Sequence, residues 1–176
     1  MIHDLFKRRR SIRKYRNDPV SREDILKCVE AARLAPTACN TQSCRFFIAE
    51  GDLKNRIVDE CLGDYPVPNG WAREAPVIAV VATVRNILTH TIGGGLRKIK
   101  YEELDAGIAG EHFVMQATEL GLGTCWIGWF RKKRLKKLLN LPTGWNVQSL
   151  IVVGYSAETP PEIERIPLDD ICKFGE

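Results

Sequence analysis

The sequence is poor in histidine, a common metal ligand and acid–base catalyst. It has three histidines in 176 residues, and none stands at zinc-finger spacing from any of the six cysteines. No two cysteines form a C-x-x-C pair, so the pattern favours reduced and mostly buried thiols over disulfides or a metal site. We expect His3, His90 and His112 to be structural or exposed, and no Ser/His/Asp or Cys/His set is evident.

A long hydrophobic run is also absent. The apolar run around Pro76–Val81 is far shorter than the ~20 residues that cross a bilayer. The N-terminal stretch MIHDLFKRRR lacks the order of basic, apolar and small residues found in signal peptides. Gly93–Gly95 do not follow a strand with G-x-G-x-x-G spacing, which argues against a Rossmann domain. These absences lead us to expect a cytoplasmic protein with no membrane segment.

What the sequence does have is an ordinary globular composition. Hydrophobic residues make up 44% of the chain and charged residues 27%, as in soluble folded proteins. The chain is long enough to bury a sizeable core, and it shows no internal repeat, low-complexity segment or linker. We therefore expect residues 1–176 to form a single domain.

The positive charge is concentrated in one stretch, KRRRSIRKYR, at residues 7–16. The net charge is +4 and this stretch alone contributes seven lysines and arginines, so the rest of the chain is slightly acidic. Three interpretations are open: a solvated basic face, an arm for nucleic acid, or a socket for one multiply charged small anion. The localised cluster argues against nucleic acid, which usually meets a whole basic face.

Hydrophobic patterning predicts helices that alternate irregularly with a few strands. A short helix is expected around Ile2, Leu5 and Phe6, and further helices over residues 22–34, 52–62, 103–120 and 131–139. Strands are expected over residues 45–49, 76–84 and 147–153. Residues 86–100 should form an exposed connection, and the tail should run over a surface before a short helix. The irregular spacing favours an α+β sandwich over a doubly wound fold.

Three stretches contain residues that could carry chemistry. Arg9, Arg10, Ser11 and Arg13 could direct guanidinium groups and a hydroxyl at one phosphate, although for this stretch taken alone a solvated basic face is the favoured interpretation. In APTACNTQSCRF, residues 35–46, small residues and two amides suit the edge of a heterocycle, and a plain polar loop is the alternative. In GLGTCWIGWF, residues 121–130, a glycine in an apolar run indicates that the backbone closely approaches another group. That group could be an aromatic ring system, and plain packing against the core is the alternative.

Together and in this order, these stretches resemble the FMN-dependent nitroreductases, specifically their short-chain branch. The resemblance covers nearly the whole chain. The matching motifs are RRSIRKY at 9–15, APTACNTQ at 35–42, APVI at 75–78, DAGIA at 105–109, GLGTCWIG at 121–128 and GYSAETP at 154–160.

The resemblance implies a set of flavin contacts. Arg9, Arg10, Ser11 and Arg13 are similar to the family positions that hold the FMN phosphate, ribityl chain and pyrimidine edge. A loop with Pro36, Thr37, Ala38, Asn40 and Gln42 corresponds to the one that the partner subunit lays against the flavin. Ile127 and Gly128 match the strand whose backbone faces flavin N5, and Arg165 matches a tail cation near the phosphate.

The resemblance also implies a fold and an activity. The fold would be a three-layer α/β/α sandwich with a mostly antiparallel central sheet, assembled as an intertwined homodimer. The protein would be an FMN-dependent oxidoreductase that takes hydride from NADH or NADPH and passes it by a ping-pong route to a nitroaromatic, quinone or related small acceptor. Arg13 would stabilise charge on the reduced flavin. A non-catalytic FMN-binding sensor or carrier remains an alternative, and a nucleic-acid-binding module a weaker one.

Two features depart from the family pattern. Gln42 is followed by Ser43-Cys44, where the family often has Pro-Trp, so the aromatic wall there is absent. The tail has Ile163 before Glu164-Arg165, where the family often has two cations spaced by one residue. Four small residues in the long helix further predict a close contact with another backbone, which the resemblance places at the dimer axis. These are Ala106, Gly107, Ala109 and Gly110.

Overall fold

The computed structural model describes residues 2–63, 67–84 and 100–175. Within these residues the chain forms an antiparallel sheet in the order β1-β2-β4-β3. The strands are β1 (Cys44–Glu50), β2 (Val77–Val84), β3 (Gly123–Ile127) and β4 (Trp145–Gly154). Patterning alone predicts the other three strands but not β3, whose place followed only from the resemblance.

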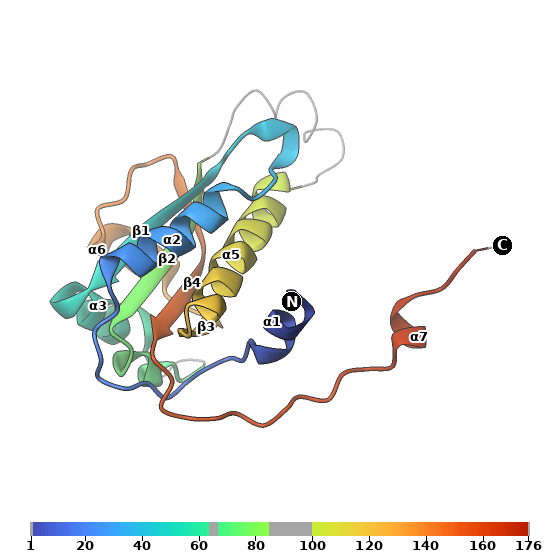
Figure 1. Cartoon of the computed structure of the whole chain (residues 1–176). Coiled ribbons are helices and arrows are strands. Elements are labelled where there is room, and N and C mark those ends of the chain that lie inside the picture. The colour runs from blue at the N-terminus through green and yellow to red at the C-terminus, as the bar shows by residue number, and fades with distance from the viewer. Residues whose placement is uncertain (1, 64–66, 85–99, 176) are drawn as a thin grey trace.

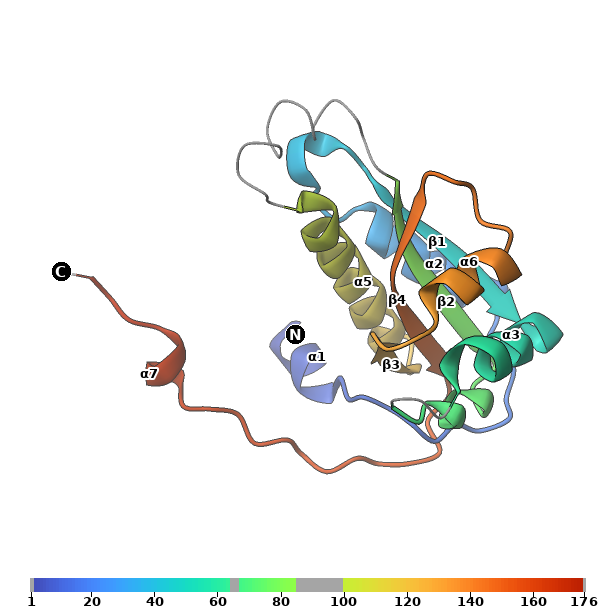
Figure 2. The same ribbon diagram turned by 180° about the vertical axis from the view of Figure 1, so that it is seen from behind.

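Helices cover both faces of this sheet. On one face lie α2 (Arg22–Arg33) and α5 (Tyr101–Glu119), as Figure 1 shows. On the other lie α3 (Gly51–Ile57), the π-helical turn η2 (Val58–Leu62) and α6 (Lys132–Leu138), seen in Figure 2. The prediction of a three-layer α/β/α sandwich is therefore confirmed.

Strand β2 holds the two halves of the core together because it is buried on both faces. Ile78 and Val80 pack with α3, η2 and α6, whereas Val77, Ala79 and Val81 pack with α2 and α5. This alternation is what an apolar, β-branched central strand produces, since successive side chains point to opposite faces.

The remaining elements are short. They are α1 (Ile2–Arg8), the 3-10 turns η1 (Ala38–Asn40) and η3 (Gly70–Arg73), and α7 (Leu168–Ile171). The single helix expected over 52–62 is divided into α3 and η2. The predicted connection over 86–100 lies, except for its last residue, outside the described residues. None of the described helices combines the length and apolar character needed to cross a membrane.

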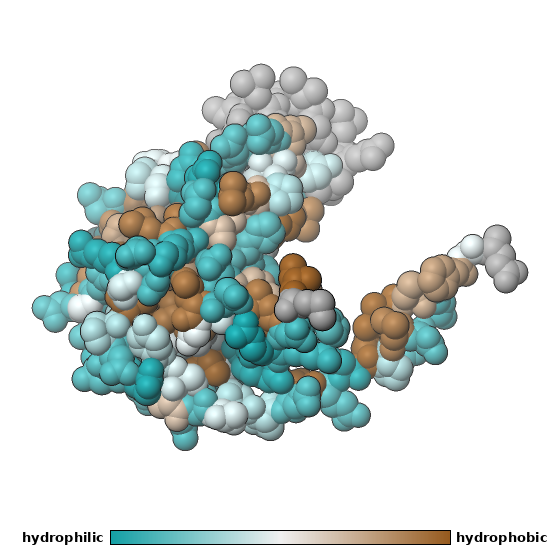
Figure 3. Space-filling view, viewed as in Figure 1, coloured by the Kyte–Doolittle hydropathy of each residue, from teal (hydrophilic) through white to brown (hydrophobic). Residues whose placement is uncertain are grey.

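The C-terminal segment does not run over the surface of its own chain, and the short helix expected there is α7. A path over the surface of a second copy stays a prediction. Beyond Pro160 the chain extends away from the body and carries α7 far from the sheet (Figures 1 and 3). It is polar and bears two prolines, yet it also exposes large apolar side chains to solvent. These are Ile163, Ile166, Leu168, Ile171 and Phe174, the last of them 94% exposed.

Candidate functional site

The basic segment that follows α1 is extended and lies beside β3. The Ile12 amide donates to the Thr124 carbonyl oxygen over 2.9 Å, and Ser11 forms a parallel bridge with Thr124. A Cβ on Gly123 would lie only 2.7 Å from the Ile12 side chain, so this close approach requires glycine. The glycine of the GLG motif thus places the arginine-rich segment against the sheet.

Tyr15 anchors the far end of this segment. Its side chain is buried, its hydroxyl donates to the Ile12 carbonyl oxygen over 2.6 Å, and its amide donates to Glu74. Burial raises the pKa of the Tyr15 phenol well above its usual range. The Glu158 carboxylate accepts from the Arg13 amide over 2.6 Å and from the Lys14 amide over 3.1 Å. These bonds fix the backbone, and among the described residues no hydrogen bond or ion pair engages the Arg13 guanidinium.

Three consecutive arginines, Arg8 at the end of α1 and the two that follow it, face carboxylates. Arg8 pairs with Glu119 at 2.7 Å, whereas the Arg9–Glu111 and Arg10–Glu162 pairs are loose, each at 3.9 Å. The Arg9 and Arg10 side chains are only 24% and 23% exposed, which is unlike a fully solvated basic face. Loose pairs of this kind contribute little stability, about 1 kcal/mol at most, so a multiply charged anion could replace the carboxylates.

A cavity of about 420 Å³ brings Arg13 together with the end of β3. Its walls also include residues 67–71, which lie far in the sequence from the residues that follow β3. The lining residues are Arg13, Val67, Pro68, Asn69, Trp71, Cys125, Trp126, Ile127, Gly128 and Trp129. A Cβ on Gly128 would meet nothing within 4 Å, so this backbone is open to a ring placed against it. Arg13, Ile127 and Gly128, which the sequence singled out separately, therefore share one cavity.

Asn69 is a site residue that sequence reasoning did not assign, because the alignment with the family slips in this region. Its side chain is buried, and its Nδ2 donates to the Trp129 carbonyl oxygen over 3.2 Å. This bond joins the two segments that form the cavity wall. Asn69 is itself the first residue of an NG dipeptide, a common turn signal, so the sequence alone does not distinguish this role.

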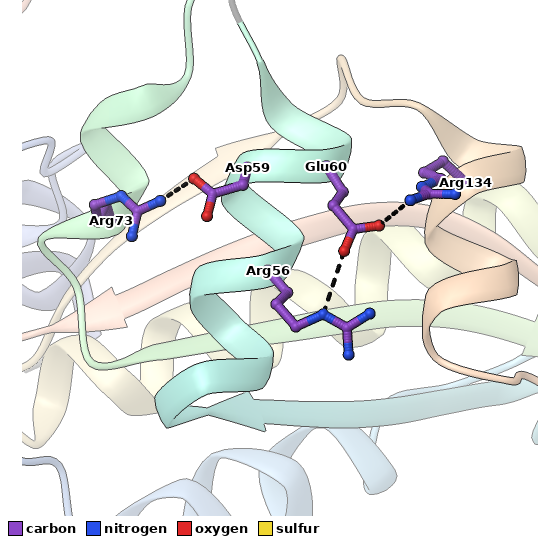
Figure 4. Close-up of polar contacts among 5 residues, drawn as sticks. All are labelled: Arg56, Asp59, Glu60, Arg73 and Arg134. Carbon is purple, nitrogen blue, oxygen red and sulfur yellow. Dashed lines mark hydrogen bonds and ion pairs between the residues drawn. The ribbon is translucent and has the colours of Figure 1, made fainter.

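Ion pairs brace the elements behind this wall (Figure 4). Glu60 of η2 pairs with Arg56 at 3.2 Å and with Arg134 of α6 at 2.5 Å, and Asp59 pairs with Arg73 of η3. Partial desolvation acts to raise the pKa of Glu60, but the hydrogen bonds from Arg56 and Arg134 outweigh it and hold the pKa below its usual value. The network thus ties η2 to η3 and α6, whose flanking residues line the cavity.

The second predicted stretch lies elsewhere in the chain. The loop of Pro36, Thr37, Ala38, Asn40 and Gln42 packs near the N-terminal end of α5, where it contacts Asp105. The basic segment instead contacts the C-terminal end of α5 through Glu119. Fourteen helical residues separate these two positions, which corresponds to roughly 20 Å. Within one chain, the structure does not bring the loop to Arg13 or Gly128.

The loop has an unusual backbone. Cys39, Asn40 and Gln42 have φ values of 52°, 52° and 47°, in the left-handed region that favours glycine. Each such residue costs about 1 kcal/mol, and asparagine somewhat less. The Gln42 amide donates to the Thr37 hydroxyl oxygen over 3.0 Å, which helps to hold this shape. The side chains of Asn40 and Gln42 are exposed.

Arg165 is not near the other predicted contacts within the same chain. It lies in the extended C-terminal segment and is exposed. The residue of that segment nearest the basic cluster is Glu162, at 3.9 Å from Arg10. A contact between Arg165 and a group held by the N-terminal arginines of the same chain would require this segment to fold back.

Comparison with known proteins identifies relatives of the whole chain. A family model described as the nitroreductase family matches residues 6–155. An FMN reductase [NAD(P)H] of Bacillus subtilis is 29% identical over 174 residues, covering 92% of this chain and 68% of the relative.

Solved structures give the same result for the fold. A nitroreductase family protein from Streptococcus pneumoniae superimposes with a TM-score of 0.84 at 22% identity, covering 99% of this chain and 100% of the other. A structure described as an oxidoreductase containing FMN has a TM-score of 0.81 at 26% identity, covering 98% of this chain and 90% of the other.

Proposed function

The chain belongs to the nitroreductase family, and we propose that it is an FMN-dependent oxidoreductase that takes hydride from NADH or NADPH. The observation that carries this proposal is the shared cavity of Arg13, Ile127 and Gly128. A relative named FMN reductase [NAD(P)H] and a structural neighbour described as containing FMN support the choice of cofactor and donor.

The residues present fit FMN. The cavity volume of about 420 Å³ lies within the range of ~300–1,000 Å³ usual for ligand sites. Arg9, Arg10 and Ser11 would hold the phosphate, because guanidinium forks pair two phosphate oxygens and a hydroxyl donates a further bond. Gly128, with open space where a Cβ would project, admits the ring. Bound FMN would supply the hydride chemistry at its N5.

The protein would contribute position and electrostatics. With FMN bound, the positive charge of Arg13 would stabilise negative charge on the ring, and the bond from the Arg13 amide to Glu158 would help to keep this cation in place. We propose that donor and acceptor use this cavity in turn, a ping-pong order. Trp71 and Trp129 line the same cavity, and their indole rings suit planar acceptors such as nitroaromatics or quinones.

We also propose that the complete site needs two copies of the chain. The predicted contacts lie at opposite ends of α5, so a second copy packed antiparallel would bring its 36–42 loop to Arg9–Arg13. An apolar groove of about 730 Å³ between α1, α2 and α5 offers a surface for this contact. Leu104 and Ile108 on α5 are 58% and 40% exposed, which favours burial against a partner. A homodimer in the cytoplasm follows as part of the proposal.

Anaerobic mixing of the purified protein with NADH or NADPH tests the function. We expect the bound flavin to lose its visible absorption, and the cofactor released by heat to chromatograph as FMN. A flavin that stays oxidised would indicate a sensor or carrier instead. Released FAD would refute the cofactor assignment. A protein that is purified colourless, and that retains no FMN once added FMN has been removed by gel filtration, would refute flavin binding altogether.

A further inference from the structure

Asp105 is a buried carboxyl group for which the proposed chemistry has no use. It lies in the first turns of α5 and is only 3% exposed. Burying a carboxylate is costly unless it accepts several hydrogen bonds. All of its described hydrogen bonds go to the segment from Ala38 to Ser43, so its partners indicate what this residue holds in place.

Three donors of that segment meet the Asp105 carboxylate. Its Oδ1 accepts from the Ala38 amide over 2.9 Å. Its Oδ2 accepts from the Ser43 hydroxyl over 3.2 Å and from the Thr41 hydroxyl over 3.4 Å. These bonds hold both ends of the strained turn in which Cys39, Asn40 and Gln42 adopt positive φ. A backbone in this conformation persists only when its surroundings determine it.

We infer that Asp105 is a positioning residue for the flavin site of the neighbouring subunit. The inference rests on the proposed function, in which the loop of one chain contacts the flavin of the other. By fixing Ala38, Thr41 and Ser43, Asp105 holds Asn40 and Gln42 on the surface in one arrangement, with their amides available to the ring. Ser43, which stands where the family often has proline, supplies a hydroxyl to this cluster and so replaces a rigid residue with a hydrogen bond.

The carboxylate acts through the loop and does not itself touch the cofactor. Its removal should therefore loosen the loop and weaken FMN binding, without changing the Arg13 cavity of the same chain. Asp105→Ala removes both acceptor oxygens and with them all three hydrogen bonds, Asp105→Asn keeps one oxygen for the Ala38 amide, and Ser43→Ala removes a single bond. The expected order of effect is Asp105→Ala, then Asp105→Asn, then Ser43→Ala.

Hydrogen exchange and FMN titration of the full-length protein test this inference together. The matched control is Val114→Ala, which creates a cavity elsewhere in the same helix. Val114 is 1% exposed and packs in the core between the sheet, α2 and α5. In FMN-free protein, we expect peptides that cover residues 38–42 to exchange at least tenfold faster in Asp105→Ala, with no selective change in Val114→Ala. The Kd for FMN should rise at least tenfold in Asp105→Ala, about threefold in Ser43→Ala and less than twofold in Val114→Ala.

The outcomes separate this inference from the proposed function. Faster exchange of the loop with an unchanged Kd for FMN would overturn the positioning role and leave FMN binding standing. Unchanged exchange in both Asp105→Asn and Ser43→Ala would overturn it as well, even if Asp105→Ala fails to fold. Failure of the unsubstituted protein to bind FMN would refute the proposed function, and with it this role of Asp105.

Discussion

Gly110 of α5 lies directly under the indole ring of Trp126 in β3. A Cβ on Gly110 would stand 2.1 Å from the nearest ring carbon, so the indole ring would have to move. Ala106 and Ala109 are likewise buried within their own chain, and only Gly107 faces open space. Packing within this chain therefore accounts for Gly110, one of the four small residues that the resemblance places at the dimer axis. The absence of a side chain at Gly110 lets β3 lie close to α5.

Gly110→Ala should consequently destabilise the protein, although alanine is the better helix former by about 1 kcal/mol. We expect the free energy of unfolding to fall by about 2 kcal/mol, since overpacked cores cost about 1–3 kcal/mol. Urea unfolding measures this change. The matched variant is Gly110→Ala combined with Trp126→Leu, in which the smaller side chain should remove much of the penalty. Equal losses with and without Trp126→Leu would contradict the contact.

Arg13→Ala should lose flavin and reductase activity, because its guanidinium is the cation that lines the cavity. Flavin content per chain after purification measures this. Arg134→Ala, on the amphipathic helix α6, is unsuitable as a control because Arg134 pairs with Glu60. Lys137→Ala, at an exposed position of α6, is the better one and should keep its full flavin complement. An Arg13→Ala protein that stays fully loaded would show that the assignment of this cavity is wrong.

Tyr15 should make the stability depend on pH in the alkaline range. Burial, followed by the nearby Cys125 and Glu158, raises the pKa of the folded phenol above its ordinary value of ~10. The fold therefore favours the neutral phenol, and its contribution is complete below pH ~10 and is lost at higher pH, by about 1.4 kcal/mol per pH unit. In Tyr15→Phe this fall should become shallower.

The measurement is urea unfolding at neutral pH and above pH ~10. At neutral pH, Tyr15→Phe should cost about 1 kcal/mol, because the Ile12 carbonyl loses its donor. Tyr101→Phe, at an exposed tyrosine, is the control for removal of a phenol as such. An identical alkaline decline in the unsubstituted protein and in Tyr15→Phe would refute the linkage.

The local patterns of the sequence predict much of the fold. The apolar β-branched run of β2 and the long periodic helix α5 are readable because their own side chains form the core. Strand β3 is not readable in this way, since it is short, contains Gly123 and takes its place by pairing with β4 and with Ile12, both distant in the sequence. The path of the C-terminal tail away from the body is equally hard to predict, because a polar, proline-bearing segment carries no periodic signal.

In the candidate site, too, local patterns are visible in the sequence and contacts between distant residues are not. Arginines clustered in one segment, and a glycine after an apolar strand, are visible in the sequence, and the structure places Arg13 and Gly128 in one cavity. The role of Asp105 is not visible, because its bond to the Ala38 amide spans 67 residues. The Asn69–Trp129 bond spans 60 residues and is hidden for the same reason. Such pairings depend on the fold and leave no local pattern.

Analytical ultracentrifugation followed at the visible absorption of the flavin tests the central claim most directly. If each flavin is bound across two chains, the absorption should sediment with a dimer at every concentration, with one FMN per chain. Ile108→Glu, which places a charge on the exposed face of α5, should yield a monomer without FMN, whereas Lys137→Glu should remain a loaded dimer. Visible absorption that sediments with a stable, FMN-loaded monomer would contradict the account.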